Sequence, residues 1–226
     1  MSGPKLRGYD AVILAGGRSS RLGGVPKAEL RVGGETLLER TLRAAQEAVC
    51  VAVAGPPSLE GILAPSAYTP VLVREDPPFS GPAAAVGAGI AALGGFSAGS
   101  GAPRRPWTFV LACDMPDAAR AVPVLLSAAD EDPSCSVLAV DGAGKTQPLA
   151  GLYRTDALLE AVAGGPATLA NLSMFSMLAR VQWREVAVPE GSTADVDTWD
   201  DAVKWGIRSG SRAAAPSSGS AAAAKE

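Results

Sequence analysis

The sequence of 226 residues contains no histidine. This absence excludes every site in which an imidazole moves protons, including Ser-His-Asp triads and Cys-His dyads. It also excludes zinc sites of the HExxH type, which need two imidazole ligands. If the protein is an enzyme, its charged chemistry depends on Asp, Glu, Lys and Arg.

Cysteine is scarce, and long apolar runs are missing. The three cysteines are odd in number and far apart, which argues against a disulfide framework and a CxxC metal site. No apolar run approaches the about 18–20 residues of a membrane helix, and the start MSGPKLRGYD lacks the apolar core of a signal peptide. We therefore expect a cytoplasmic protein that binds no membrane. The net charge of -3 argues against broad nucleic-acid binding.

Short apolar runs alternate with helical patterns along the chain. The expected strands are 10–15, 50–55, 70–75, 107–113, 135–140, 149–153 and 181–188. The expected helices are 35–49, 81–93, 117–129, 155–163 and 168–180. This alternation predicts an α/β fold in which a mostly parallel sheet carries helices on both faces, forming a three-layer sandwich.

The chain shows no internal repeat and no clear linker, so residues 1–208 are predicted to form a single domain. Two segments are predicted to lack regular structure. Residues 94–106 form a loop rich in Gly, Pro and Ser, and residues 209–226 form a low-complexity tail that is expected to be disordered.

The first predicted strand ends in a turn that is rich in glycine and positive charge. The strand end and the turn lie within VILAGGRSSRLGGVPKAEL at 12–30. Its glycines are Gly16, Gly17, Gly23 and Gly24, and its cations are Arg18, Arg21 and Lys27. Ligands of open parallel sheets bind beyond the carboxyl ends of the strands, where this turn lies. Glycines expose backbone N–H groups to phosphate, and guanidinium groups grip its oxygens. A plain glycine turn with solvated cations is the alternative, but the density of both features favours an anion site.

This turn carries neither of the two common phosphate-binding motifs. A P-loop needs Ser or Thr after its lysine, whereas Ala28 follows Lys27, and the Rossmann GxGxxG is missing. The stretch instead resembles the signature of the MobA-like nucleotidyltransferases, LAGGxSxRxGxxK with one or two residues of play before the lysine. The matching residues are Leu14, Ala15, Gly16, Gly17, Ser19, Arg21, Gly23 and Lys27.

Four later segments resemble further motifs of that family, in the same order. They are REDPPFSGPAAAV at 74–86, ACDMP at 112–116, QPLAGLYR at 147–154 and DVDTWDD at 195–201. The resemblance covers about residues 10–205. It implies a Rossmann-like nucleotidyltransferase fold and the transfer of a nucleotidyl group from an NTP to a phosphorylated acceptor, with release of pyrophosphate.

The resemblance also implies which residues bind the nucleotide. Lys27 and Arg21 would hold the NTP phosphates and counter their charge during the reaction. The backbone of Leu14, Ala15, Gly16 and Gly17 would lie against the nucleotide.

The segment 74–86 would supply a further part of that site. Asp76 is implied to contact the nucleotide, with Glu75 as a solvated neighbour. Gly81 opens a helix whose small residues would allow close approach to the base or ribose. Tight packing of this helix on the sheet is the alternative explanation for its alanines and glycines.

Asp114 follows the predicted strand 107–113, at the ligand edge of the sheet. Its place in the CDxP motif implies a magnesium ligand, and Mg²⁺ takes one or two carboxylates plus substrate phosphates. The alternative is a helix N-cap, since Asp caps well and Pro116 suits a first helical turn. Cys113 is expected to point into the core and not to act as a nucleophile.

The stretch 195–201 contains Asp195 and Asp197. Related nucleotidyltransferases place a metal-binding Asp in this late region, so Asp197 is a candidate second metal ligand. A turn before a capped helix is the alternative. Two positions depart from the family pattern: Pro26 stands where Asp is frequent, and Ala54 where Asn is often found beside the nucleotide. The second departure puts one base contact in doubt.

Within the family, the LAGG and CDxP forms look most like the molybdenum cofactor guanylyltransferases. That likeness implies GTP and Mo-molybdopterin as substrates, Mg²⁺ as cofactor, and molybdoenzyme apoproteins or other cofactor-biosynthesis proteins as candidate partners. The acceptor would lie near Gln147, Pro148 and Asn171. The alternatives are another NTP with another acceptor, such as a sugar phosphate, phospholactate or molybdopterin in cytidylyl transfer, or a nucleotide-binding protein without catalysis.

Overall fold

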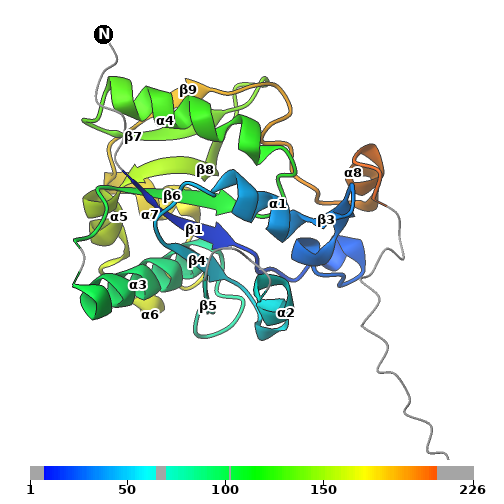
Figure 1. Ribbon diagram of the computed structural model, residues 1–226, viewed down its shortest axis with the longest axis horizontal. Coiled ribbons are helices and arrows are strands. Elements are labelled where there is room, and N and C mark those ends of the chain that lie inside the picture. The colour runs from blue at the N-terminus through cyan, green and yellow to red at the C-terminus, as the bar shows by residue number, and fades with distance from the viewer. Residues whose placement is uncertain (1–7, 65–69, 102, 208–226) are drawn as a thin grey trace, which may run out of the picture.

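The computed structural model describes residues 8–64, 70–101 and 103–207 (Figure 1). The predicted tail at 209–226 lies outside these residues. All seven predicted strands are present in one sheet of order β5-β4-β1-β6-β8-β7-β9. They are β1 (Asp10–Leu14), β4 (Val51–Ala54), β5 (Val71–Val73), β6 (Trp107–Ala112), β7 (Ser136–Val140), β8 (Thr146–Arg154) and β9 (Trp183–Ala187).

Within this sheet the pairings are parallel except for those of β8, which runs antiparallel to both β6 and β7. The start of β8 therefore lies at the same edge as the ends of the other strands. The pairing of Leu111 with Ala150 shows this directly, because it joins the end of β6 to the first half of β8.

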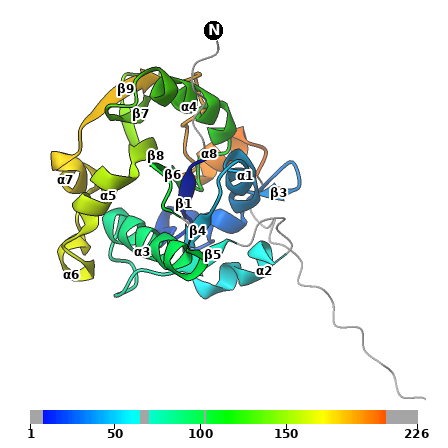
Figure 2. The ribbon, with the colours of Figure 1, turned by 60° about the vertical axis from the view of Figure 1, so that its left-hand side comes forward.

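Helices cover both faces of the sheet, as predicted for a three-layer α/β fold (Figures 1 and 2). The helices are α1 (Leu37–Ala44), α2 (Glu60–Leu63), α3 (Pro82–Ser100), α4 (Val122–Glu131), α5 (Thr155–Val162), α6 (Pro166–Leu169), α7 (Met174–Met177) and α8 (Trp199–Lys204). Short 3₁₀ turns are η1 (Ser20–Leu22), η2 (Lys27–Glu29), η3 (Pro57–Leu59), η4 (Ala118–Arg120) and η5 (Leu178–Arg180).

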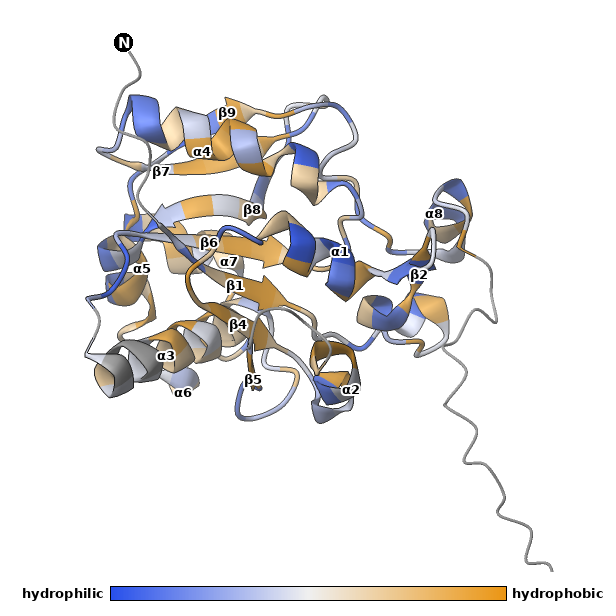
Figure 3. Ribbon diagram, viewed as in Figure 1, coloured by the Kyte–Doolittle hydropathy of each residue, from blue (hydrophilic) through white to orange (hydrophobic). Residues whose placement is uncertain are grey.

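Alternating side chains of the strands form two cores, one beneath each layer of helices. Ile13 and Phe109 pack in the core that includes Leu38 of α1 and Leu125 of α4. The second core, on the opposite face, joins residues such as Val12 and Val110 to Val86 and Ile90 of α3 and Leu158 of α5. Figure 3 shows the apolar strands between helices such as α1 and α4, whose ribbons mix hydrophilic and hydrophobic residues. Burial of one such large side chain stabilises the fold by about 1.5–3 kcal/mol.

The small residues of α3 allow it to pack tightly on the sheet, which confirms this alternative explanation for its alanines and glycines. A Cβ on Gly89 would lie 2.5 Å from Val12 Cγ1 of β1, and one on Gly87 would lie 2.5 Å from Leu169 Cδ1 of α6. Both glycines are needed for close contact between elements.

The structure differs from the prediction in three helical regions. The helix expected at 35–49 is shorter, because α1 ends at Ala44 with Ala45 as its C-cap. The prediction of a loop at 94–106 is wrong for the first half of this segment, because α3 continues to Ser100 and ends at Gly101 with φ 66°. A glycine weakens a helix by about 1 kcal/mol, a preference that tertiary packing overrides. The helix expected at 168–180 is divided into α6, α7 and η5, because Asn171 adopts φ 60° and the Ser173 side chain caps a new helix by accepting from Ser176 N.

Two small elements were missed, the short helix α2 and a hairpin. Strands β2 (Arg31–Val32) and β3 (Glu35–Thr36) form an antiparallel hairpin whose two-residue loop is Gly33–Gly34, both with positive φ. A Gly-Gly pair between short extended segments is a known hairpin signal. Within the described ranges, no helix has both the length and the apolar character that a membrane crossing requires.

Candidate functional site

The candidate site lies along the edge of the sheet where the parallel strands end. The strand order places the loop after β5 at one end of this edge, the turn after β1 in the middle, and the loop after β6 next to it. The start of β8 follows, because that strand runs in the opposite direction.

The glycine-rich turn leaves β1 in an extended conformation. Ala15 N donates to Ala54 O at 2.8 Å, which continues the pairing of β1 with β4. Gly17 has φ 130°, a conformation that side chains rarely adopt. Gly16 has no such constraint, and a Cβ there would lie 3.8 Å from Ala54 O, an ordinary contact. The fold itself does not require glycine at position 16, whereas close approach of a ligand to the backbone would.

Lys27, at the start of η2, is held by acids from two distant segments. Its Nζ donates to Asp114 Oδ2 at 2.8 Å and also donates to Asp197 Oδ1. Arg21 Nη1 donates to Asp197 Oδ2 at 3.2 Å and is otherwise exposed. Partial burial alone would lower the pKa of Lys27, but the two carboxylates outweigh it and raise the pKa. The ammonium group therefore remains charged.

Asp114 follows β6 directly, where Cys113 N donates to Leu14 O at 2.9 Å. The N-cap alternative for Asp114 is wrong: Asp117 precedes η4 and Ala121 precedes α4. The Asp114 carboxylate instead points to Lys27. Cys113 is buried, as expected, and burial strongly raises the pKa of its thiol, so it is not a thiolate nucleophile.

Acidic charge accumulates near Asp114. Burial raises the pKa of Asp195, and the carboxylates of Asp197 and Asp114 raise it further. Among the described residues, no three acidic or cysteine side chains are arranged as a complete metal site. Mg²⁺ needs only one or two carboxylates when substrate phosphates supply further oxygens, so Asp114 fits that role together with a nucleotide.

Two cavities lie beside this cluster. The first, of about 320 Å³, is lined by Leu14, Gly16, Gly17, Arg18, Lys27, Glu75, Phe79, Gly81, Pro82, Ala85, Ala112, Cys113, Asp114 and Leu149. The second, of about 570 Å³, shares Gly81, Pro82, Ala112, Asp114 and Leu149 with the first. The two cavities therefore adjoin, with the Asp114 carboxylate at their common boundary.

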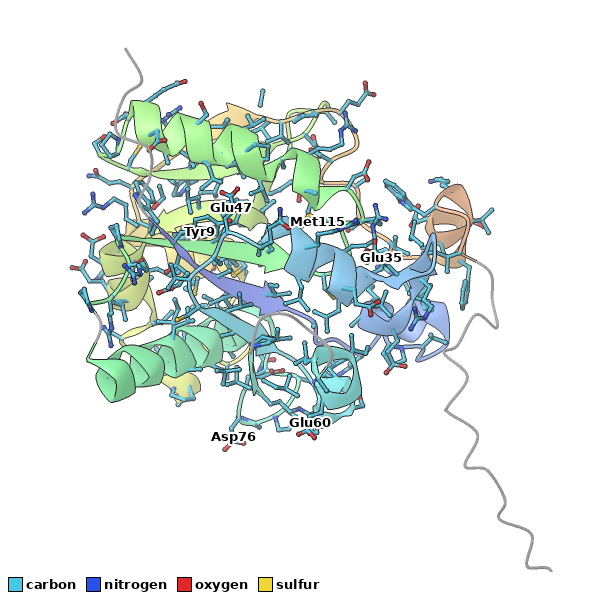
Figure 4. The ribbon with its side chains drawn as sticks, in the orientation of Figure 1. Tyr9, Glu35, Glu47, Glu60, Asp76 and Met115 are labelled. Atoms are coloured by element: carbon cyan, nitrogen blue, oxygen red, sulfur yellow. The ribbon has the colours of Figure 1, made fainter. Side chains whose placement is uncertain are left out.

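The second cavity extends from this boundary to the β7–β8 hairpin and α7. Its polar lining includes Lys145, Thr146, Gln147, Asn171, Ser173, Thr193 and Asp195, and its apolar lining includes Met115, Leu172, Met174 and Phe175. Lys145 is the one cation among the described residues that line it. Figure 4 labels Met115, whose side chain lies near the end of β6.

Local backbone features fix the positions of Pro148 and Asn171, two of the residues that were predicted to bind the acceptor. Pro148 lies where the pairing of β7 with β8 is irregular, which suits a residue without an N–H donor. Pro148 O accepts a hydrogen bond from the buried Tyr153 hydroxyl at 2.6 Å. Asn171, with its left-handed backbone, donates from N to Ser80 O at 2.6 Å and so lies beside Gly81.

The structure brings together most of the predicted site residues. Leu14, Gly16, Gly17, Lys27, Gly81 and Asp114 line the first cavity, and Gln147, Pro148 and Asn171 line the second. Ala15 and Arg21 do not line the first cavity, and Arg21 pairs with Asp197. Asp76 lines a neighbouring groove along α3 instead, and Figure 4 shows it at the margin of the molecule. Glu75, expected as a solvated neighbour, lines the first cavity.

One aromatic residue of the site was not predicted. Phe79 lines the first cavity and lies between two guanidinium groups, with Arg18 Cζ 5.4 Å and Arg74 Cζ 5.2 Å from its ring centroid. The sequence showed an aromatic residue within the segment 74–86, but its backbone conformation and its two cation–π contacts depend on the folded loop.

The arrangement suits chemistry on an anionic ligand. A cation, exposed backbone N–H groups and a carboxylate able to bind a divalent ion surround one cavity, and a second cavity opens beside the same carboxylate. Such a site can bring two anions together and neutralise a phosphate leaving group.

One protein-family model matches most of the chain. The model of the MobA-like NTP transferase domain matches residues 11–180. No curated protein matches the chain at the level of sequence.

Solved structures share the fold at low sequence identity. Molybdopterin-guanine dinucleotide biosynthesis protein A from Archaeoglobus fulgidus has a TM-score of 0.62 and 19% identity, covering 87% of this chain and 96% of that one. 2-C-methyl-D-erythritol 4-phosphate cytidylyltransferase from Thermus thermophilus has a TM-score of 0.58 and 22% identity, with 88% and 97% covered. A Mycobacterium tuberculosis protein in complex with manganese has a TM-score of 0.63 and 18% identity, with 88% and 98% covered.

Proposed function

Since this chain belongs to the MobA-like NTP transferase family and is therefore a nucleotidyltransferase, we propose that it transfers GMP from GTP to Mo-molybdopterin. The products are molybdopterin guanine dinucleotide and pyrophosphate. The observation that carries the proposal is the pair of adjoining cavities that share Asp114. One holds GTP, and the other holds the phosphorylated acceptor.

In this reaction, a phosphate oxygen of the acceptor attacks the α-phosphorus of GTP. The bond between that phosphorus and the oxygen bridging to the β-phosphate breaks, and pyrophosphate leaves with the bond electrons. The second pKa of a phosphate monoester is about 6, so the nucleophile is already largely ionised at pH 7 and needs no strong base. The absence of histidine is compatible with this chemistry.

The chain's own groups bring the two anions together. Lys27 moves from its carboxylate partners to the GTP phosphates, where its charge neutralises the departing pyrophosphate. Arg21 adds charge from its position beside Asp197. The turn at Gly16 and Gly17 offers backbone N–H groups to the phosphates.

Asp114 would hold Mg²⁺ together with the phosphates of GTP, and Asp197 is the candidate for a second contact. When bound, Mg²⁺ neutralises charge on the phosphates. Asp114 orients the nucleotide towards the acceptor, because it lies at the boundary of the two cavities.

Two considerations support GTP and molybdopterin. The LAGG and CDxP forms of the motifs resemble the guanylyltransferases, and the Archaeoglobus fulgidus structure carries the name of a molybdopterin-guanine dinucleotide biosynthesis protein. The second cavity also combines Gln147 and Asn171 with an apolar wall at Met115 and Phe175, which suits a flat heterocycle with hydrogen-bonding edges.

A second candidate is cytidylyl transfer to a small phosphorylated alcohol. It is favoured by the similar structure of a 2-C-methyl-D-erythritol 4-phosphate cytidylyltransferase. The two candidates differ in base and in acceptor, so one assay distinguishes them.

Pyrophosphate release tests the proposal. The purified protein is incubated with GTP, CTP, ATP or UTP, with and without Mg²⁺, and with Mo-molybdopterin, methylerythritol phosphate or a sugar phosphate. Release that requires GTP, Mg²⁺ and molybdopterin together supports the proposal. Turnover with CTP or UTP alone would overturn the choice of guanine, and nucleotide binding without turnover with any acceptor would indicate a protein without catalysis.

A further inference from the structure

Phe79 is held in an unfavourable backbone conformation. Its φ is 64°, a region that bulky side chains rarely occupy, and its side chain is 46% exposed. Burial of the ring therefore offsets little of the conformational cost. Strain of this kind persists where surrounding contacts impose it, and it is common at ligand sites.

Two sets of contacts fix the residue in this state. Glu75 Oε1 accepts a hydrogen bond from Phe79 N at 2.9 Å. The guanidinium groups of Arg18 and Arg74 lie 5.4 and 5.2 Å from the ring centroid. Arg18 lines the first cavity with Phe79, whereas Arg74 lines the groove along α3. The cavity side of the ring is therefore the side that Arg18 covers.

The order of the sheet indicates which part of a nucleotide would reach Phe79. The loop that carries Phe79 starts at β5, at the opposite end of the sheet edge from β8, and its last residues, Gly81 and Pro82, reach the boundary of the two cavities. Phe79 itself lines the first cavity and not the second. The turn after β1 and Asp114 lie between these ends. If the acceptor lies at β8 and the phosphates at the turn after β1, the base points towards β5.

We propose that Phe79 is a stacking platform for the nucleobase of the NTP, and that the Arg18 guanidinium covers the ring until the base replaces it. Aromatic side chains stack on any base, because every base has a π-face. Phe79 therefore contributes affinity, and its contribution should differ little between bases. This inference rests on the proposed use of the first cavity for the nucleotide.

The alternative is a purely structural clamp, in which Phe79 ties the glycine-rich turn to the loop after β5. The two roles predict opposite effects of Phe79→Gly. Glycine adopts φ 64° without strain, so a platform can be removed with little loss of stability. A clamp cannot, because its loss would loosen both loops.

The test measures binding and stability of the full-length protein with Phe79→Gly and Phe79→Tyr. Calorimetry with Mg²⁺ gives dissociation constants for GTP and for inorganic tripolyphosphate, which has phosphates but no base. We expect Phe79→Gly to weaken GTP binding roughly 10- to 100-fold, with tripolyphosphate binding unchanged and a melting temperature lowered by no more than about 3 °C. Phe79→Tyr should bind GTP as the wild type does.

Phe175→Ala is the matched control, because Phe175 is a similarly exposed aromatic residue that lines the second cavity. Its GTP affinity should equal that of the wild type. Equal weakening of GTP and tripolyphosphate by Phe79→Gly, or unchanged GTP binding, would overturn the inference. If the wild type prefers CTP, the choice of GTP has failed. The same comparison of variants, with CTP in place of GTP, then still tests the role of Phe79.

Discussion

Lys27 Nζ lies 2.8 Å from Asp114 Oδ2 and also donates to Asp197, so three distant segments of the chain meet at one ammonium group. The cation has a partner before any ligand binds, which limits the repulsion between the two carboxylates. Phosphates that enter the first cavity would compete with these carboxylates for Lys27. The carboxylates would then be available to a divalent ion.

Replacement of Lys27 by Ala should reduce kcat/KM for nucleotidyl transfer by roughly 100-fold or more, the usual effect of removing one charge-stabilising donor. Steady-state kinetics measures this loss. Arg43→Ala is the control, because Arg43 pairs with Glu35 on the surface and such pairs contribute little. Wild-type kcat/KM in the Lys27 variant would show that Lys27 has no role in transfer.

In the presence of GTP, the Asp114→Asn variant should add nothing to the Mn²⁺ affinity that free GTP has by itself, because the amide is a poor ligand for a hard cation. Electron paramagnetic resonance of free Mn²⁺ measures the bound fraction. Asp117→Asn, three residues away and paired with Arg40, should bind Mn²⁺ normally. Normal Mn²⁺ affinity in the Asp114 variant would contradict the metal assignment.

Gly16→Ala should leave the free energy of unfolding nearly unchanged, because its Cβ meets only an ordinary contact. It should weaken GTP binding if the ligand approaches the backbone there. Gly142→Ala is a matched control, since its Cβ would also lie 3.8 Å from its nearest neighbour, Glu190 Cγ. Calorimetric titration with GTP measures the affinity of both variants. If Gly16→Ala bound GTP as tightly as Gly142→Ala does, this role of Gly16 would be contradicted.

Lys145→Ala should raise KM for the acceptor about tenfold, as expected for an exposed charge-assisted contact with phosphate. KM for the NTP should not change, because Lys145 lines the second cavity and not the first. Lys145→Arg should restore most of the acceptor affinity. A rise in both KM values would indicate a general structural effect instead.

Asp201 gives a pH dependence of stability. Hydrogen bonds from the Thr198 side chain, followed by those from Lys204, lower the pKa of Asp201 to about 2. Because the folded-state pKa lies below the ordinary value of 3.8, the stabilisation is fully present above pH 3.8 and is lost as the pH falls through about 2. Urea unfolding of the wild type and Asp201→Asn should therefore differ at pH 7 and converge near pH 2. A difference that is independent of pH would contradict this account.

The sequence predicted the strands well, because nearly every strand residue near the centre of the sheet is apolar and buried. It predicted helix ends less well. Helix α3 continues through Gly94 and Gly95 in spite of their weak helix preference, and the break at Asn171 depends on a left-handed backbone beside Ser80.

Sequence motifs mark Lys27 and Asp114 as candidate site residues, so their presence at one site could be predicted. Contacts between distant segments could not be predicted. Nothing in the local sequence shows that Asp197 shares the ammonium group of Lys27, or that Glu75 and not Asp76 faces the first cavity. Both relationships follow from loop conformations that periodicity and spacing do not encode.

The reversed direction of β8 divides the site between two parts of the chain. The first cavity is lined almost entirely by residues up to Asp114, whereas the β7–β8 hairpin and the segment around α7 contribute mainly to the second. If the second cavity holds the acceptor, as proposed, substitutions in the β7–β8 hairpin should change acceptor preference and leave nucleotide binding intact. Exchange of this hairpin between members of the family should then change the acceptor and not the nucleotide.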